Sequence, residues 1–266
     1  MAAIKGWWNG FLLNLQFFTI VPVTKSIEMN PLNVNGAVRT FPILGAFQGF
    51  IFIMAAWLLH ATPFSDLACS FFLMVFMIAF TGGIHLDGWI DASDAYFSYQ
   101  TKEKRLEVMK DPRTGAFGVL SIILLLAAKF LFVFEIMQRF TINTYWFLFL
   151  IPIFSKSIMG WMLHQLTPAK DEGLAYFFKK DLDNHLPMHY TVYLILIAAS
   201  CFIINFSIFR QFVLLLITAV MFIAFASMKI NKWFGGMTGD ILGASVEGGE
   251  LFLWMIAWLW HYFATV

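Results

Sequence analysis

Long apolar runs separated by polar connections dominate the hydrophobic pattern of the chain. A helix that crosses the hydrocarbon core of a bilayer, about 30 Å thick, needs about 20 consecutive apolar residues. The chain has seven segments that approach this length: 40–60, 65–84, 116–137, 145–163, 190–206, 212–228 and 251–264. The last two are short for a bilayer. The pattern predicts an all-α polytopic membrane protein with about seven transmembrane helices.

An amphipathic segment precedes the first of these runs. Residues 4–21 place Trp7 and Trp8 beside a helical face formed by Phe11, Leu12, Leu15 and Phe18. This pattern is typical of a helix that lies in the membrane interface, with its tryptophans at headgroup level. Polar residues interrupt the apolar stretch and no small-residue cleavage site follows, so a cleavable signal peptide is not expected.

Lysine and arginine are distributed unevenly between the connections. The N-terminal stretch and the connections 86–114, 164–189 and 229–250 are rich in them, whereas each shorter connection carries at most one. In multi-pass proteins the positively charged loops are the cytoplasmic ones. We therefore expect a multi-pass protein of the cell (inner) membrane, with the N-terminus and the three long connections in the cytoplasm and the C-terminus outside.

The composition agrees with this topology. Of 266 residues, 60% are hydrophobic and 12% are charged, against about 45–50% and about a quarter in a soluble domain. The length leaves no room for a second soluble domain, so residues 1–266 are predicted to form a single integral membrane domain. A formal net charge of +1 gives no basis for nucleic-acid binding. Cys69 and Cys201 lie inside apolar runs and are expected to be buried and unpaired.

The stretch HLDGWIDASDAY, residues 85–96, places three aspartates just after an apolar run. Asp87, Asp91 and Asp94 are spaced i, i+4 and i+7, which puts all three on one face of a helix. Like charges at this spacing repel one another, so a divalent cation between them is the simplest explanation. Oxygen ligands suit Mg²⁺, Mn²⁺ or Ca²⁺, and Mg²⁺ commonly joins one or two carboxylates to substrate phosphates. The alternative is a solvated acidic loop or a helix cap.

Basic residues follow the aspartates. Within residues 101–118, Arg105, Lys110 and Arg113 are candidates for phosphate binding. The preference of cytoplasmic loops for positive charge explains them equally well. A later segment, residues 164–187, mixes both signs of charge with aromatic side chains. It could cover a substrate, or it could be an amphipathic surface segment.

A second acidic cluster lies near the C-terminal end. Residues 235–250 combine several glycines with Asp240, Glu247 and Glu250, and we expect a tight re-entrant loop against a ligand or another helix. An ordinary glycine-rich turn is the alternative. Few ionisable groups lie within the spans, chiefly Lys129, Glu135 and Lys156. Each of the two lysines could snorkel, pair with a carboxylate or line a polar cavity.

Three spaced motifs identify a family resemblance: TGGIHLDGWIDASDA at 81–95, RLEVMKDPRTGAFGVL at 105–120 and GGMTGDILGASVEGGE at 235–250. With the N-terminal LQFFTIVPV at 15–23, they closely resemble the cobalamin synthase family, the adenosylcobinamide-GDP ribazoletransferases. The motifs occur in the family's order and the resemblance covers most of the chain. One departure is Ala95, where the family is expected to have glycine.

The resemblance implies a Mg²⁺-dependent membrane transferase of late vitamin B12 (cobalamin) biosynthesis. Such an enzyme joins α-ribazole, or its 5′-phosphate, to adenosylcobinamide-GDP, releases GMP and forms adenosylcobalamin or its 5′-phosphate. The aspartate motif also resembles that of the CDP-alcohol phosphotransferases, in which spaced aspartates hold two metal ions. The spacing differs here, so the roles do not transfer aspartate by aspartate.

The residue pattern and the resemblance together assign roles within two predicted cytoplasmic active-site segments, 85–118 and 229–250. The predicted Mg²⁺ ligands are Asp87, Asp91 and Asp94. The predicted general base is Asp94 or Asp240. The predicted substrate-binding side chains are Arg105, Lys110, Arg113, Glu247 and Glu250.

Two other functions and one structural question stay open. A lipid phosphotransferase that uses a CDP-alcohol would share the metal chemistry. A cation transporter would use the acidic cluster as its entry ring, but the spans contain almost no carboxylates to continue such a path. The lipid bilayer is an expected partner, and the pattern leaves homo-oligomerisation undetermined.

Overall fold

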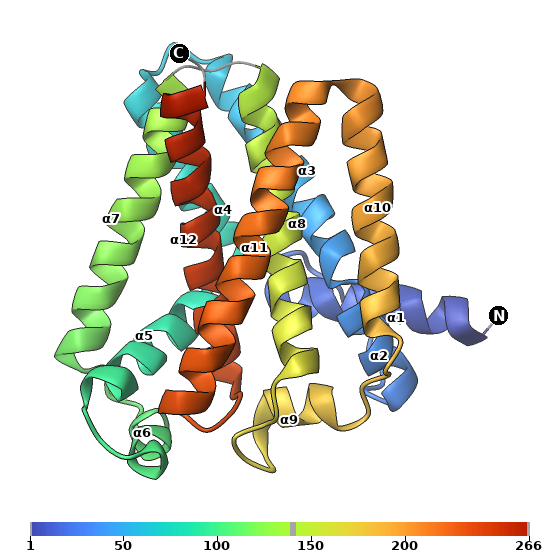
Figure 1. Cartoon of the computed structure of the whole chain (residues 1–266), viewed down its shortest axis with the longest axis vertical. Helices are drawn as coiled ribbons and strands as arrows, with labels where there is room; N and C mark the ends of the chain where they lie inside the picture. Colours follow the sequence, from blue (N-terminus) through green and yellow to red (C-terminus); the bar gives the residue numbers. More distant parts are fainter. Residues whose placement is uncertain (1, 139–141, 265–266) are drawn as a thin grey trace.

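The computed structural model describes residues 2–138 and 142–264, and within them the secondary structure is helical, with no strand (Figure 1). The helices of these residues are α1 (Ala2–Phe18), α2 (Pro31–Arg39), α3 (Phe41–His60), α4 (Asp66–Thr81), α5 (Ile84–Phe97), α6 (Lys102–Val108), α7 (Ala116–Gln138), α8 (Ile142–Gln165), α9 (Gly173–Lys180), α10 (Leu186–Ile204), α11 (Phe206–Trp233) and α12 (Gly239–Ala264). The all-α prediction is confirmed. Cys69 and Cys201 are free and buried, as expected.

Among the described residues, six helices are long and apolar enough to cross a bilayer: α3, α7, α8, α10, α11 and α12. The shortest, α10, has 19 residues. At 1.5 Å per residue it is about 28 Å long, close to the thickness of the hydrocarbon core. Helices α4 and α5 pass the same test only as a pair bent by 89°, which gives seven spans if the pair counts as one. The prediction of about seven spans is confirmed.

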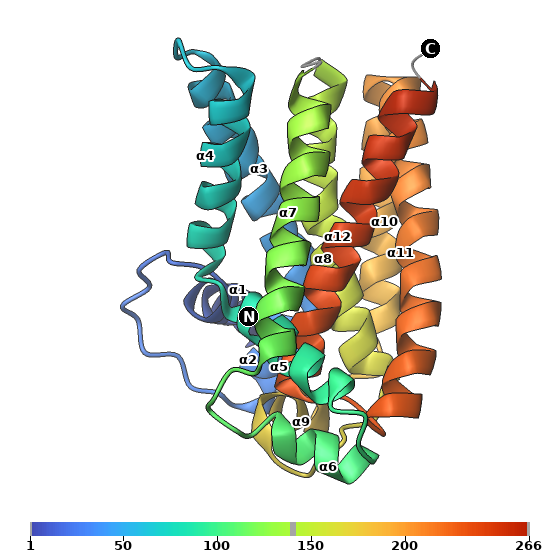
Figure 2. The ribbon, with the colours of Figure 1, turned by 90° about the vertical axis from the view of Figure 1, so that its left-hand side faces the viewer.

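Helix α8 forms the centre of the bundle, with the other long helices around it (Figure 1, Figure 2). Of the apolar window of α8, 78% is buried, against 11–50% for the other candidate spans. The outer helices therefore turn large apolar side chains toward lipid, whereas α8 contacts protein on nearly all sides. A polar group on α8 is consequently deep inside the molecule.

The polar connections gather at one end of the bundle, which we call the motif end. It carries α5, α6, α9 and the connection 234–238 (Figure 1). The opposite end carries the connection 61–65, the turn between α10 and α11, and the C-terminal end of α12. The predicted grouping of the long polar connections on one side is confirmed, and their cytoplasmic location stays a prediction.

Two details of the predicted layout are wrong. In place of a turn at 207–211, Asn205 alone separates α10 from α11, and its side chain accepts a hydrogen bond from the backbone N–H of Ser207 at 2.7 Å. The re-entrant loop predicted at 235–250 is largely helical, since α12 begins at Gly239. A buried lysine neutralises the glutamates of α12, as shown below, so the helix can carry them into the bundle. Both final spans are therefore longer than their apolar runs.

Candidate active site

The three aspartates of the HLDGWIDASDAY motif lie on helix α5, as their spacing predicts. The helix follows Gly82 and Gly83, whose φ angles of 68° and 69° lie in the left-handed region that favours glycine. These glycines turn the chain by 89° from α4. Helix α5 therefore runs across the motif end (Figure 1), where its acidic face meets the other polar segments.

Asp94 holds the start of α7 in place. Its carboxylate oxygens accept hydrogen bonds from the backbone N–H groups of Gly115 and Gly118, each at 2.7 Å. These groups belong to a helix N-terminus, where a negative charge is favourable. A Cβ atom on either glycine would clash with the carboxylate. Asp94 thus caps a neighbouring helix, and its roles as metal ligand and general base stay predictions.

Asp240 approaches the acidic helix from the first turn of α12. A Cβ atom on Gly88 would lie 2.6 Å from the carbonyl oxygen of Asp240, so the two backbones are in direct contact and only glycine fits between them. Gly88 lies next to Asp87 in the sequence, and the side chains of Asp87 and Asp240 line the same cavity. Two motifs about 150 residues apart in the chain, those of α5 and α12, therefore form one site.

The carboxylates of this site repel one another, and Lys170 offsets part of the charge on Asp240. Burial and the neighbouring carboxylates of Asp87, Asp240 and Asp94 raise the pKa of Asp91 on α5 from 3.8 to about 6. The ion pairs formed within residues 2–138 and 142–264 involve other acidic side chains. We name Asp87, Asp91 and Asp240 the acidic cluster.

The acidic cluster fits Mg²⁺ in its donor chemistry. All its side-chain donors are carboxylate oxygens, which Mg²⁺ prefers, and their mutual repulsion favours a divalent cation. In the described part of the chain, however, no three His, Cys, Asp or Glu side chains are close enough together to hold a metal as they stand. The Mg²⁺ site predicted at Asp87, Asp91 and Asp94 therefore stays a prediction.

A cavity of about 500 Å³ opens beside the acidic cluster at the motif end. Helices α5, α8, α9 and α12 supply most of its wall. Its charged lining residues are Asp87, Lys110, Lys170, Glu172 and Asp240. Apolar side chains such as Phe18, Phe41 and Phe178 close its inner side. The cavity thus presents carboxylates and lysines to one space that is large enough for part of a nucleotide-sized ligand.

Two lysines lie in the wall of this cavity. Lys110, a predicted phosphate ligand, forms an ion pair with Glu172 at 2.6 Å. The Lys170 ammonium donates to the carbonyl oxygen of Leu106 at 2.9 Å, and burial, reinforced by nearby Lys110, lowers its pKa. Sequence analysis did not single out Lys170. The sequence feature that could have indicated Lys170 is the segment to which it belongs, 164–187, which was expected either to cover a substrate or to lie on the surface.

The other predicted phosphate ligands lie outside the cavity wall. The Arg105 guanidinium donates to the carbonyl oxygen of Trp233 at 3.2 Å and lies 5.4 Å from the ring centre of Tyr96. It therefore ties α6 to α5 and α11. Arg113 is 87% exposed and pairs with Asp111 at 2.7 Å, which lowers the pKa of that carboxyl to about 2. Neither arginine reaches the cavity in this structure.

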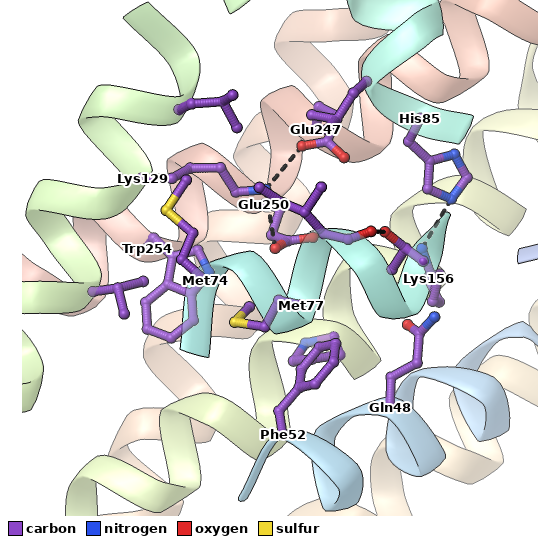
Figure 3. Close-up of a pocket in the computed structure, with 16 residues that line it drawn as sticks. Gln48, Phe52, Met74, Met77, His85, Lys129, Lys156, Glu247, Glu250 and Trp254 are labelled. Carbon is purple, nitrogen blue, oxygen red and sulfur yellow. Dashed lines mark hydrogen bonds and ion pairs between the residues drawn. The ribbon is translucent and has the colours of Figure 1, made fainter. Parts of the chain in front are cut away.

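Glu247 and Glu250 face the interior of the bundle (Figure 3). Their carboxylates lie 2.8 and 3.1 Å from the ammonium of Lys129 on α7. Nearby, the Nζ atom of Lys156 lies 3.0 Å from Nε2 of His85. These five side chains line a second cavity of about 30 Å³, large enough to hold water. The two glutamates, predicted to bind substrate, are thus engaged in a buried ion pair, one of the alternatives considered for Lys129.

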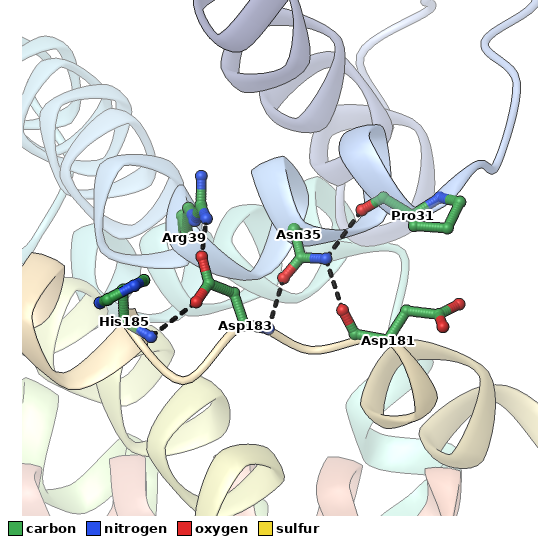
Figure 4. Close-up of polar contacts among 6 residues, drawn as sticks. All are labelled: Pro31, Asn35, Arg39, Asp181, Asp183 and His185. Atoms are coloured by element: carbon green, nitrogen blue, oxygen red, sulfur yellow. Dashed lines mark hydrogen bonds and ion pairs between the residues drawn. The ribbon is translucent and has the colours of Figure 1, made fainter.

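Helix α9 covers the cavity beside the acidic cluster. Polar contacts fix the connection that follows α9 to helix α2 (Figure 4). The side chain of Asn35 donates to the carbonyl oxygen of Asp181 at 2.6 Å and accepts from the backbone N–H of Asp183 at 2.7 Å. Arg39 forms an ion pair with Asp183. The backbone N–H of His185, with Arg39, lowers the pKa of Asp183. Segment 164–187 therefore forms part of the cavity wall.

These features define a class of protein before any comparison. A membrane bundle that gathers carboxylates and lysines around one cavity at one end is organised as an enzyme, because a channel or transporter places polar groups along the membrane depth. A family model described as cobalamin-5-phosphate synthase matches residues 10–258. The chain belongs to this family.

Curated relatives match nearly the whole chain. A protein from Geobacillus sp. (strain WCH70), named adenosylcobinamide-GDP ribazoletransferase, is 38% identical over 99% of this chain and 100% of its own length. Proteins of the same name from Geobacillus thermodenitrificans (strain NG80-2) and Clostridium botulinum (strain Alaska E43 / Type E3) are 36% and 31% identical, over 96% and 93% of this chain and 97% and 96% of their own lengths. No solved structure gives a significant match. The family resemblance is confirmed, and the chain is a transferase.

Proposed function

We propose that the chain transfers the adenosylcobinamide-phosphate group of adenosylcobinamide-GDP to α-ribazole or its 5′-phosphate, with Mg²⁺ as cofactor. The acceptor hydroxyl oxygen bonds to the phosphorus attached to the cobinamide arm, and the bond from that phosphorus to GMP breaks. The hydroxyl proton passes to a carboxylate of the protein. The products are GMP and adenosylcobalamin or its 5′-phosphate. The observation that carries the proposal is the cluster of mutually repelling carboxylates beside a cavity that also contains two lysines.

In this proposal Asp87 and Asp91 hold the metal. Mg²⁺ commonly uses one or two protein carboxylates together with substrate phosphates, and these two side chains are one helical turn apart on α5. When bound, the ion neutralises charge on the diphosphate. We favour these two over Asp94, since both oxygens of Asp94 already accept hydrogen bonds from the start of α7.

We assign the general base to Asp240. Its side chain lines the cavity, on a different helix from the two metal-binding carboxylates. A base must lie within hydrogen-bond reach of the hydroxyl that it deprotonates, so a carboxylate that faces the substrate cavity is better suited than one engaged in capping. Asp94, the other candidate from the sequence, is therefore the weaker choice.

We assign the phosphate oxygens of the GDP group to Lys110 and Lys170. Both lysines line the cavity, and each can exchange its present partner for a phosphate. Fixed positive charges that face the transferred group stabilise the charge that develops in phosphoryl transfer. On release of GMP, Lys110 returns to Glu172 and Lys170 returns to the carbonyl oxygen of Leu106.

The corrin ring suits the opposite side of α5. Two apolar grooves of about 620 and 660 Å³ flank Trp89 there, and both include Trp233. The adjacent residues Gly88 and Trp89 of α5 thus line a polar cavity and an apolar groove, respectively. A substrate with a polar nucleotide and a bulky, partly apolar ring can occupy both. This arrangement explains why a soluble product is synthesised by a membrane protein.

We further propose that the motif end faces the cytoplasm in the cell membrane. The basic residues of segment 101–118 lie there, in keeping with the distribution of positive charge in multi-pass proteins. The cytoplasm is also the compartment that supplies nucleotide-activated substrates.

The proposed function is tested by incubating purified protein with adenosylcobinamide-GDP, α-ribazole and Mg²⁺. The expected result is equimolar GMP and completed cobalamin, resolved by chromatography. Replacing α-ribazole with its 5′-phosphate determines which acceptor is preferred. A parallel incubation with a CDP-alcohol tests the lipid phosphotransferase alternative, for which CMP release without GMP release would be the signature.

A further inference from the structure

A buried polar contact joins the acidic helix α5 to the centre of the bundle. Nζ of Lys156 on α8 lies 3.0 Å from Nε2 of His85 in the first turn of α5 (Figure 3). The two residues are 2% and 5% exposed. An ammonium has no acceptor lone pair, so Lys156 donates and the imidazole accepts. A lysine at this depth in a membrane protein is costly and usually serves a function, and the proposed reaction uses neither residue.

His85 is held on three sides. Its ring stacks on Phe18 of α1, with ring centres 5.4 Å apart and an interplanar angle of 20°. Its backbone lies against Gly243 of α12, where an added Cβ atom would be 3.3 Å from the Cα atom of His85. Together with the contact to Lys156, these neighbours fix the first turn of α5 relative to α1, α8 and α12.

Side-chain hydrogen bonds contribute little else to holding the first turn of α5. It follows Gly82 and Gly83, and no atom lies within 4 Å of a Cβ atom built on Gly82. The N-cap residue is Gly83, which has no side chain that could cap the helix. Farther along, Gly88 packs on α12 and Asp94 binds the start of α7. Among the side-chain hydrogen bonds of the described residues, the bond from Lys156 is the one that ties this first turn to another helix.

We propose that Lys156 and His85 are a positioning pair that sets the rotation of α5 about its axis, and with it the separation of Asp87 and Asp240. This inference rests on the proposed function, in which these carboxylates act together. Side chains reach about 5–6 Å from a helix axis, so a rotation of about 20° moves a carboxylate by about 2 Å. Misplacement of a catalytic group by about 1 Å can reduce a rate by about 100-fold.

Three variants separate positioning from simple stabilisation. His85→Phe keeps the ring that stacks on Phe18 but leaves the Lys156 ammonium without its partner, so the melting temperature should fall. Lys156→Met keeps the apolar stem and removes the ammonium. Because Lys156 also acts electrostatically on Glu247 and Glu250, Glu250→Gln accompanies Lys156→Met in every variant, which keeps the buried charges balanced. The double variant then leaves neither an unbalanced charge nor an unpaired ring nitrogen, so its melting temperature should return toward that of the wild type.

The expected result is that stability and turnover respond differently. In the double variant the melting temperature recovers, while kcat for GMP release stays about 10- to 100-fold below wild type, with KM for adenosylcobinamide-GDP changed by less than about threefold. Amide hydrogen exchange in residues 84–93 should be faster than in the wild type. His85→Gln, whose amide oxygen can accept from Lys156, should regain most of the turnover and the slow exchange.

Wild-type turnover and wild-type exchange in the double variant would overturn the proposal. If that variant does not fold, Lys156→Met with Glu250→Gln serves the same purpose, because the buried charges stay balanced; wild-type values there would equally contradict the positioning role. Hydrogen exchange is measured without turnover, so it tests the positioning pair independently of the proposed function. Wild-type protein that lacks transfer activity would refute the proposed function, whereas unchanged exchange in the variants would refute the positioning pair.

Discussion

The molecule contains two groups of charged side chains that differ in how their charge is balanced. In the acidic cluster, the carboxylates of Asp87, Asp91 and Asp240 lie close enough to repel one another, and this repulsion contributes to the raised pKa of Asp91. Inside the bundle, Glu247 and Glu250 contact the Lys129 ammonium at 2.8 and 3.1 Å. Both groups use carboxylates from the sequence motifs of α5 and α12, yet only one of them borders the larger cavity.

The difference indicates which carboxylates take part in the reaction and which stabilise the helix bundle. A neutralised carboxylate inside a membrane protein allows a polar helix to pack, and it has little free capacity to bind a substrate. A cluster of mutually repelling carboxylates is unfavourable for folding, and a bound cation or a cationic group relieves the repulsion. The acidic cluster is therefore expected to govern turnover, and the buried ion pair to govern stability.

The largest expected effect is that of Asp240→Asn. Loss of the proposed general base should reduce GMP release by about 10²- to 10⁴-fold, while the melting temperature stays within a few degrees of wild type because the change removes a repelling charge. Asp240→Glu, which keeps the carboxylate, is the matched control and should retain more activity. Turnover of Asp240→Asn near the wild-type value would remove this residue from the mechanism.

Lys129→Met should have the largest effect on stability. It removes the ammonium that contacts both buried carboxylates, and breaking a buried pair in this way costs about 3–5 kcal/mol. The measurement is the amount of folded, monodisperse protein and its melting temperature. Adding Glu247→Gln and Glu250→Gln to the variant should restore folding. Lys104→Met, which breaks only an exposed pair with Glu107, should cost less than about 1 kcal/mol.

Asp94→Asn distinguishes capping from catalysis. An amide retains one acceptor oxygen for the N–H groups of Gly115 and Gly118, so the variant should lose about 1–3 kcal/mol of stability. Thermal unfolding and GMP release are measured on the same preparation. If the protein is as stable as wild type but inactive, Asp94 acts directly in the reaction, and the assignment of the base to Asp240 has to be revised.

Lys170→Met should give the smallest of these changes. Removing one of the two proposed phosphate contacts is expected to raise KM for adenosylcobinamide-GDP by about tenfold, equivalent to about 1.4 kcal/mol, with kcat less affected. Lys104→Met removes the same charge from an exposed position outside the cavity and provides the control. An unchanged KM in Lys170→Met would exclude a contact between this lysine and the nucleotide.

The sequence predicted the elements better than the contacts between them. The spacing of Asp87, Asp91 and Asp94 correctly predicted one helical face, since periodicity is a local property. It could not show that Asp94 caps α7, because that depends on a close approach to Gly115 and Gly118.

Local sequence patterns could not predict the partners of the other charged residues either. Lys129 and Glu247 are 118 positions apart, and their contact arises from the packing of α7 on α12. For the same reason Glu247 and Glu250 resembled substrate ligands in the sequence. Lys170 was not singled out because only the fold places the segment before α9 in the cavity wall.

The most direct test of the division between the two groups is a paired measurement of GMP release and melting temperature for Asp91→Asn and Glu247→Gln. Both variants replace a carboxylate with its amide. Asp91→Asn should lose about 100-fold or more in GMP release and keep or raise its melting temperature, whereas Glu247→Gln should lower the melting temperature and retain most of the release. The opposite pattern, with an active Asp91→Asn and a stable but inactive Glu247→Gln, would contradict the assignment of the chemistry to the acidic cluster.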